Sequence, residues 1–206
     1  MKSNSPISIR FNIANALRVT GALLVIFWCA QARAASLSGY LRDPSGNPIA
    51  GADLDLHYAS TGVKLVTPND NTDATGFYSF NVFPGVYHIT YDSPRGSHFI
   101  GKRVLNVTVP SSGLVRDETL ALGSVISGIV TDAAAQPVDS VNIDIDSLAG
   151  GRLYTSNDMT DAAGNYGIVV PNGSYRLRFS PLRGSRSRGV QRDTVIITKD
   201  TVINLV

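Results

Sequence analysis

Histidines at positions 57, 88 and 98 are the first candidates for acid–base or metal chemistry in this 206-residue sequence. A hydrolytic site would need a nucleophile and an orienting acid beside one of them, or further metal ligands. His57 and His88 fall on the polar faces of two predicted strands, and His98 follows the loop residues Arg95-Gly96-Ser97. We therefore predict solvated surface histidines, with no catalytic residue and no cofactor. A cryptic hydrolase built around one of these histidines is kept as an alternative.

Acidic residues offer two places for a metal ion. Asp53, Asp55 and His57 alternate along one predicted strand, but at ~3.3 Å per residue the first and last lie about 13 Å apart and cannot share one ion. Residues 69–73 read Asn-Asp-Asn-Thr-Asp, which is rich in oxygen ligands yet lacks the ordered spacing and final glutamate of a calcium loop. We predict a solvated strand face, a polar turn and no metal site.

Arginine is concentrated near the C-terminal end of the sequence. Residues 165–192 contain six arginines and no acidic residue. The planar guanidinium group gives paired hydrogen bonds to carboxylates and phosphates. Two interpretations stay open: a solvated surface, or a binding site for an anionic surface polymer, an acidic glycan or an acidic protein. The six residues are Arg176, Arg178, Arg183, Arg186, Arg188 and Arg192.

Aromatic rings that could stack on a sugar are few. Most tyrosines fall on the apolar faces of predicted strands, which leaves Tyr40 and Tyr154 as the candidate exposed rings. A carbohydrate-binding module is therefore the first alternative function, with these two tyrosines as its stacking surface.

The first 34 residues have the layout of a secretory signal peptide. Basic residues precede an apolar run at 19–30, and Ala32-Arg33-Ala34 provides a small-x-small cleavage site. The run is shorter than the ~20 residues of a membrane span, so we predict cleavage after Ala34, export to the periplasm or beyond, and no transmembrane segment in the mature chain. A retained membrane anchor is the competing interpretation.

Removal of this segment changes the chemistry of the chain. It carries four of the 18 basic residues and none of the 16 acidic ones, so 14 basic residues remain against 16 acidic and the net charge becomes −2. The single Cys and single Trp also leave. A nucleic-acid partner, a disulfide and a cysteine metal site are therefore not expected.

The remaining chain contains one unit twice. Residues 37–41 recur as 126–130, a shift of 89, and the stretch Thr-Asp-x-x-Gly-x-Tyr at 72–78 recurs at 160–166, a shift of 88. Each unit has the size of a small domain. We predict domains at 35–122 and 124–206.

Each unit is predicted to consist of strands. Apolar and polar residues alternate with period two, and turn residues separate the runs. Several short strands at regular spacing favour a two-sheet sandwich. The predicted inward sets are Ala52, Leu54, Leu56 and Tyr58, Tyr78, Phe80 and Val82, and Tyr87, Ile89 and Tyr91 in the first copy, matched by Val141, Ile143 and Ile145, Tyr166, Ile168 and Val170, and Tyr175, Leu177 and Phe179 in the second.

These repeated motifs resemble the carboxypeptidase regulatory-like domain family. The resemblance rests on Ser-Gly at 38–39 and 127–128, on the Thr-Asp-x-x-Gly-x-Tyr stretches, and on Gly-x-Tyr at 85–87 and 173–175. It implies two tandem seven-stranded antiparallel sandwiches similar to transthyretin (prealbumin), related to carbohydrate-binding modules. It also implies an accessory role, and it names no ligand.

Together these features predict an exported, non-catalytic, all-β protein. Its expected role is a binding or scaffolding module with a protein or a cell-surface polymer as partner.

Overall fold

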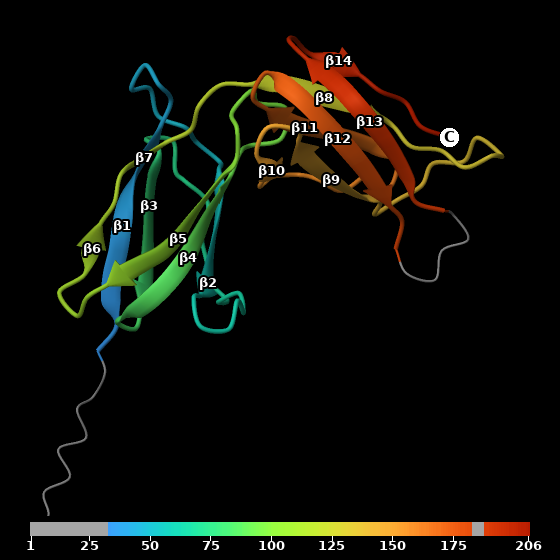
Figure 1. The fold of residues 1–206 in the computed structure, drawn as a ribbon. Helices are drawn as coiled ribbons and strands as arrows, with labels where there is room; N and C mark the ends of the chain where they lie inside the picture. The colour runs from blue at the N-terminus through green and yellow to red at the C-terminus, as the bar shows by residue number, and fades with distance from the viewer. Residues whose placement is uncertain (1–32, 183–187) are drawn as a thin grey trace, which may run out of the picture. The chain divides into compact units, whose positions relative to one another are not determined.

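The computed structural model describes residues 33–182 and 188–206, and the described chain is built of short β-strands and turns (Figure 1). Residues 1–32, which hold most of the predicted signal peptide, lie outside it. Among the described residues no helix is long and apolar enough to cross a membrane. The strands are β1 (Ala35–Arg42), β2 (Asp53–Tyr58), β3 (Phe77–Val82), β4 (Gly85–Asp92), β5 (Lys102–Val109), β6 (Leu114–Val115), β7 (Glu118–Thr119), β8 (Ser124–Ile129), β9 (Asn142–Ser147), β10 (Gly151–Arg152), β11 (Asn165–Val170), β12 (Gly173–Ser180), β13 (Val190–Ile197) and β14 (Thr201–Val202).

Each copy of the repeat forms two sheets. In the first copy β1 lies between β3 and the short strands β6 and β7, while β4 lies between β2 and β5. In the second copy β8 lies between β11 and β14, and the other sheet has the order β10-β9-β12-β13. The buried faces of the two sheets contribute to one apolar cluster in each copy, which is the arrangement of a β-sandwich.

The prediction of wholly antiparallel sheets is wrong at one edge of each copy. β6 and β7 run parallel to β1, and β14 runs parallel to β8. The reason is topological: after β5 or β13 the chain crosses to the other sheet and enters it in the same direction as the first strand. The two predicted domain boundaries, at 122 and 124, stay a prediction.

The period-two pattern placed the core correctly with one exception. Leu54 and Leu56 on β2 are fully buried, as are their counterparts Ile143 and Ile145 on β9. Tyr58, predicted to face inward, is 43% exposed. It is the last residue of β2, where the strand leaves the core, and its ring packs beside that of Tyr87 with centroids 5.7 Å apart.

The repeated Thr-Asp-x-x-Gly-x-Tyr stretch joins strands rather than forming a site. The hydroxyl of Thr72 donates to the Ile49 carbonyl at 2.7 Å and accepts from the Ala52 amide at 2.9 Å. Thr160 makes the same two bonds, to Val138 at 2.7 Å and from Val141 at 2.8 Å. The threonine therefore ties a loop to the edge of the core in both copies.

The remaining motif residues also have structural tasks. The carboxylate of Asp73 accepts hydrogen bonds from the Thr75 hydroxyl and from the amides of Thr75 and Phe77. These bonds lower the pKa of Asp73, and the Thr75 hydroxyl contributes most. Gly76 has a φ of 76°, and a side chain there would meet the Leu41 carbonyl. The hydroxyl of Tyr78 donates to the Arg116 carbonyl at 2.5 Å. Equivalent bonds occur at Asp161 and Tyr166.

Candidate functional site

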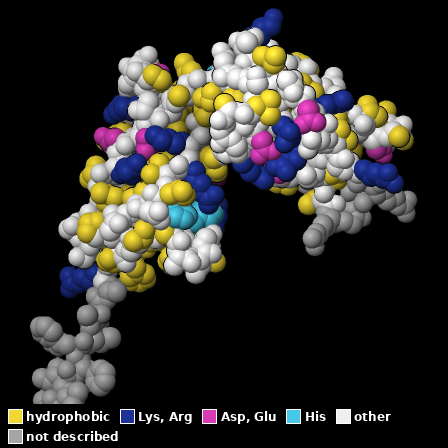
Figure 2. All heavy atoms as spheres, in the orientation of Figure 1, with side chains coloured by type: hydrophobic (Ala, Val, Ile, Leu, Met, Phe, Trp, Pro, Cys, Tyr) yellow, Lys and Arg dark blue, Asp and Glu magenta, His cyan; other side chains and the backbone are white. Residues whose placement is uncertain are grey.

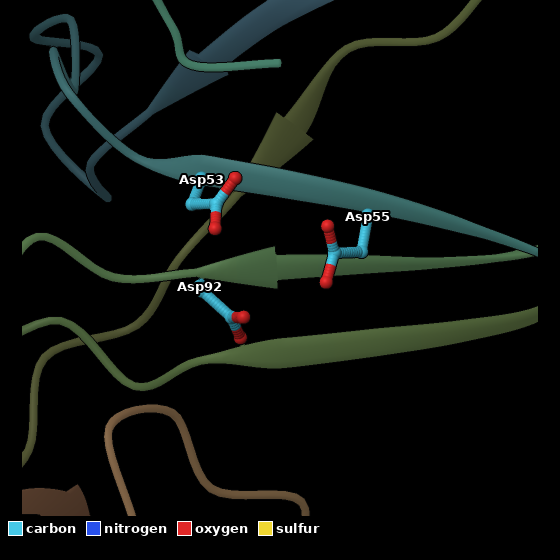
Figure 3. A group of neighbouring side chains, drawn as sticks. All are labelled: Asp53, Asp55 and Asp92. Carbon is cyan, nitrogen blue, oxygen red and sulfur yellow. The ribbon is translucent and has the colours of Figure 1, made fainter. Parts of the chain in front are cut away.

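Three carboxylates gather beside the paired strands β2 and β4 (Figure 3). Asp53 and Asp55 lie two residues apart on one face of β2, and Asp92 ends β4 directly opposite Asp53. One oxygen from each lies within 4.8 Å of the others. The first two residues were singled out from the sequence, but Asp92 was missed because the cluster forms across strands. Antiparallel pairing of 53–58 with 87–92 was the signal that would have revealed it.

The cluster is electrostatically unfavourable and is partly balanced by a lysine. Burial, then the charges of Asp55 and Asp70, raise the pKa of Asp53 above its usual value. Burial is also the main cause of the raised pKa of Asp92. Lys64 forms an ion pair with Asp55, and that hydrogen bond is the largest cause of the raised pKa of the lysine.

Tyr154 donates its hydroxyl hydrogen to Asp92. Burial first, and this hydrogen bond second, raise the pKa of Tyr154. The ring is only partly exposed and lies 6.0 Å from the Arg103 guanidinium carbon. Tyr154, a candidate exposed ring from the sequence, is therefore part-buried, with its hydroxyl and its ring already in contact with neighbours. A role of this ring in sugar stacking stays a prediction.

Three carboxylates at this separation have the chemistry of a hard cation site. Here, however, Asp55 already contacts Lys64 and Asp92 already accepts from Tyr154. His57, the other residue of the predicted pattern, turns its Nδ1 to within 3.2 Å of the Gly62 carbonyl oxygen. Lys64 and Tyr154 partly balance the cluster, and we assign no metal to it.

The three histidines do not form a nucleophile–base arrangement in the described residues. His57 and His88 lie opposite each other on β2 and β4, on the strand faces that point away from the buried Leu56 and Ile89. The Nδ1 atom of His88 accepts from the Asn106 amide at 3.1 Å. His98 Nε2 lies 2.9 Å from the carboxylate of Asp200.

The arginines of the second copy are partly paired within the protein. On β12, Arg176 contacts Asp193 at 2.6 Å and Arg178 contacts Asp146 at 2.8 Å. Across residues 33–182 and 188–206, Arg188 and Arg192 have no ion-pair partner, while positions 183 and 186 lie outside the described residues. Figure 2 shows basic and acidic side chains interspersed on the visible face of this copy.

Tyr40 is the remaining candidate ring for sugar stacking. Its side chain is 37% exposed. The Phe77 ring lies 5.3 Å away in a tilted arrangement, and the Arg42 guanidinium carbon lies 4.9 Å from the ring centroid. Part of the ring is therefore already covered by neighbouring side chains.

A pocket of about 480 Å³ opens at one end of the second sandwich. Its apolar wall includes Val130, Val141 and Phe179, all of them core residues. Thr131 and Arg188 also line it. This pocket was not predicted from the sequence.

Comparisons with known proteins yield structural likeness only. No family model matches the sequence, and no curated protein matches it significantly. The chain is 14% identical to the Bacillus anthracis TIE protein, with a TM-score of 0.34, and 84% of this chain covers 33% of that one. The chain is 10% identical to the shaft pilin SpaA from Lactobacillus rhamnosus GG, with a TM-score of 0.34, and 84% of this chain covers 96% of that one. It is 16% identical to a Bacteroides uniformis protein to which carbohydrate binding has been ascribed, with a TM-score of 0.34, and 79% of this chain covers 98% of that one.

The chain thus spans about a third of the length of the TIE protein that it matches. With identities and TM-scores this low, none of these likenesses carries an inference about function. The all-β architecture of the described residues follows from the strand pairing itself.

Proposed function

We propose that this protein is an exported, non-catalytic binding or scaffolding module with two carboxypeptidase regulatory-like repeats. Its partner is a protein or an anionic cell-surface polymer, met in the periplasm or outside the cell. Neither a cofactor nor a metal takes part.

The observation that supports this proposal is the use of the repeated polar residues. In both copies the threonine, the aspartate and the tyrosine of the shared motif direct their polar atoms to the protein's own backbone. What the two copies share therefore holds the fold together. A binding function then belongs to the surfaces where the copies differ. The six arginines between positions 176 and 192 of the second copy form one such surface.

Export is supported by the layout of residues 1–34, and N-terminal sequencing tests it. The protein recovered from the periplasm or the medium should begin Ala-Ser-Leu-Ser at Ala35. A mature, membrane-bound form that keeps Met1 would contradict cleavage.

Binding to an anionic partner is tested with lipopolysaccharide, polyphosphate and a neutral glucan on a biosensor. We expect binding to the first two, weakening with salt because exposed charges are screened. Replacing Arg183, Arg186 and Arg192 together by Ser should reduce binding several-fold. The matched control replaces Arg176 and Arg178, which already have acidic partners, and should have a smaller effect.

Three results would count against this assignment. They are salt-independent binding, equal effects of the two variants, and no binding to either anion. Preference for the neutral glucan, lost on replacing Tyr40, would instead favour the carbohydrate-binding alternative.

A further inference from the structure

Two strands at sheet edges are protected against pairing with another chain. The edge strand β5 of the first copy carries Lys102 and Arg103, and a bulge interrupts its pairing with β4. The edge strand β13 of the second copy carries Arg192 and Asp193, and its pairing with β12 has a bulge at the corresponding place. Charged residues and bulges are the features by which proteins keep an edge strand from accepting a further strand.

The edge strand β3 of the first copy has neither feature. Its six residues read Phe-Tyr-Ser-Phe-Asn-Val, with no charge and no proline among them. All six pair with β1 in an unbroken antiparallel register. Among the described residues no strand pairs with the other side of β3, and Ser79 and Asn81 are exposed. β3 therefore presents a regular and uncharged edge.

The free backbone groups of β3 can be identified from its pairing with β1. The Ser38 carbonyl accepts from the Arg116 amide at 2.7 Å, so the backbone groups of Ser38 face away from β3. Ser38 lies opposite Ser79, and two opposed residues of an antiparallel pair either both bond across it or both point away from it. The amide and carbonyl of Ser79, and those of Asn81 two residues on, therefore point to the open side. In the described parts of the chain they have no other backbone partner.

The corresponding strand of the second copy, β11, is less accessible. It is also uncharged, and it pairs with β8 without interruption. Gly167 and Val169 take the places of Ser79 and Asn81, but both are half-buried. A glycine inside a strand also weakens the strand, because it has no side chain to pack. The first copy therefore offers the more accessible edge, and the second provides a matched control.

We propose that β3 is a dimerisation edge, which pairs in antiparallel orientation with β3 of a second copy of this chain. The two-fold axis passes beside Phe80, so that Ser79 of each chain lies opposite Asn81 of the other. In this register both residues donate and accept across the pair. Four backbone hydrogen bonds then join the two chains, and all the free groups of Ser79 and Asn81 are used.

The occupant is a second copy because this edge is complementary to itself. Like charges that meet across a strand pair destabilise it, and β3 has no charge. In the proposed register the buried residues Tyr78, Phe80 and Val82 of both chains lie on one side of the joined sheet, and the exposed residues lie on the other. A foreign peptide gains specificity from pockets for its alternate side chains, whereas here Ser79 and Asn81 match each other across the axis.

This proposal goes beyond the binding role proposed above, since it concerns the first copy and none of the arginines of the second. Hydrogen exchange of the purified protein, followed by NMR at several protein concentrations, tests it residue by residue. Exchange of the Ser79 and Asn81 amides should slow by about fivefold when the concentration rises about a hundredfold, because dimerisation follows mass action. Exchange of the Gly167 and Val169 amides should not change.

Two variants of β3 test the same edge by analytical ultracentrifugation. Ser79→Pro removes the donor that faces the open side and leaves the pairing with β1 intact, so two of the four bonds are lost. It should raise the dissociation constant of the dimer by about tenfold or more. Asn81→Lys should have a similar effect, because it places a charge at the edge of each chain. The matched control Gly167→Pro should leave the constant unchanged, and thermal melts check that each variant is folded.

A protein that stays monomeric over the whole concentration range would overturn the proposal. A dimer that neither β3 variant weakens would also overturn it, as would a dimer that Gly167→Pro weakens equally. Loss of dimerisation in Ser79→Pro together with failure of the polymer-binding test would refute the anionic partner and leave the β3 edge standing.

Discussion

Replacement of Thr72 by valine or by serine shows whether the shared threonine stabilises the fold through its hydroxyl group or through its methyl group. The Thr72 side chain is 5% exposed, and its hydroxyl satisfies one buried carbonyl, of Ile49, and one buried amide, of Ala52. Valine keeps the size of the side chain but leaves both backbone groups without this partner. Serine keeps the hydroxyl and removes one methyl group.

The two substitutions should therefore have unequal costs. Each backbone group left unsatisfied costs about 1 to 3 kcal/mol, and the extra apolar contact of valine offsets about 0.8 kcal/mol. Thr72→Val should lower the free energy of unfolding by about 1 to 5 kcal/mol, which is the cost of two such groups less that offset. Thr72→Ser should lower it by about 1 kcal/mol, the value of one buried methyl group.

Urea unfolding followed by circular dichroism measures both costs, and Thr160 provides a matched pair in the second copy. A variant in one copy should shift only the transition of that copy, because the two apolar clusters share no residue. If valine is as stable as serine at either position, the hydroxyl does not anchor the loop. If both transitions shift together, the two copies unfold as one domain.

Three further predictions rest on particular contacts. Ala135→Gly should raise the free energy of unfolding in urea by up to about 1 kcal/mol, because Ala135 has a φ of 59°, which strains a residue with a side chain. Gly46→Ala at the corresponding turn should lower it, although no atom lies within 4 Å of the added methyl group. If both variants change the stability in the same direction, backbone strain is not the cause. Burial raises the pKa of Asp92, so ionisation of this carboxyl group destabilises the folded protein. The stability advantage of Asp92→Asn over the parent should therefore grow as the pH rises above about 4, near the usual pKa of an aspartate, and a constant or shrinking difference would contradict it. Tyr175→Ala removes a ring that is 3% exposed and donates to the Pro171 carbonyl at 2.6 Å, and should cost about 3 to 5 kcal/mol in a chemical melt; a neutral effect would show that the ring is not in the core.

The alternation of side chains was readable from the sequence because it depends on local geometry. Leu54 and Leu56 alternate with aspartates, and a strand turns such a pattern into one buried face wherever it pairs. Tyr58 continues the same alternation but lies where the strand leaves the core. The pattern does not contain that information, because the end of the core is set by the neighbouring strands.

The candidate sites depend on which strands pair, which is why they were predicted less well. Asp92 joins Asp53 only through the register of β2 with β4. The partners of Arg176 and Arg178 are brought in from β13 and β9. The role of Thr72 was missed because a threonine between strands is normally solvated, and its burial depends on a loop that folds back over 20 residues.

The parallel pairing at the edge of each sandwich has a mechanical consequence. The strand that begins each copy lies beside one that ends it, β1 beside β6 and β7, and β8 beside β14, and all run in the same direction. The chain therefore enters at one end of this pair and leaves at the other. Tension applied through the two ends of a copy pulls the paired strands along their own axes, so the hydrogen bonds between them are loaded in shear and resist together. In a hairpin pulled open from its free ends the bonds would break singly, in sequence. Tension between the two ends of a copy is thus carried in part by these paired edge strands.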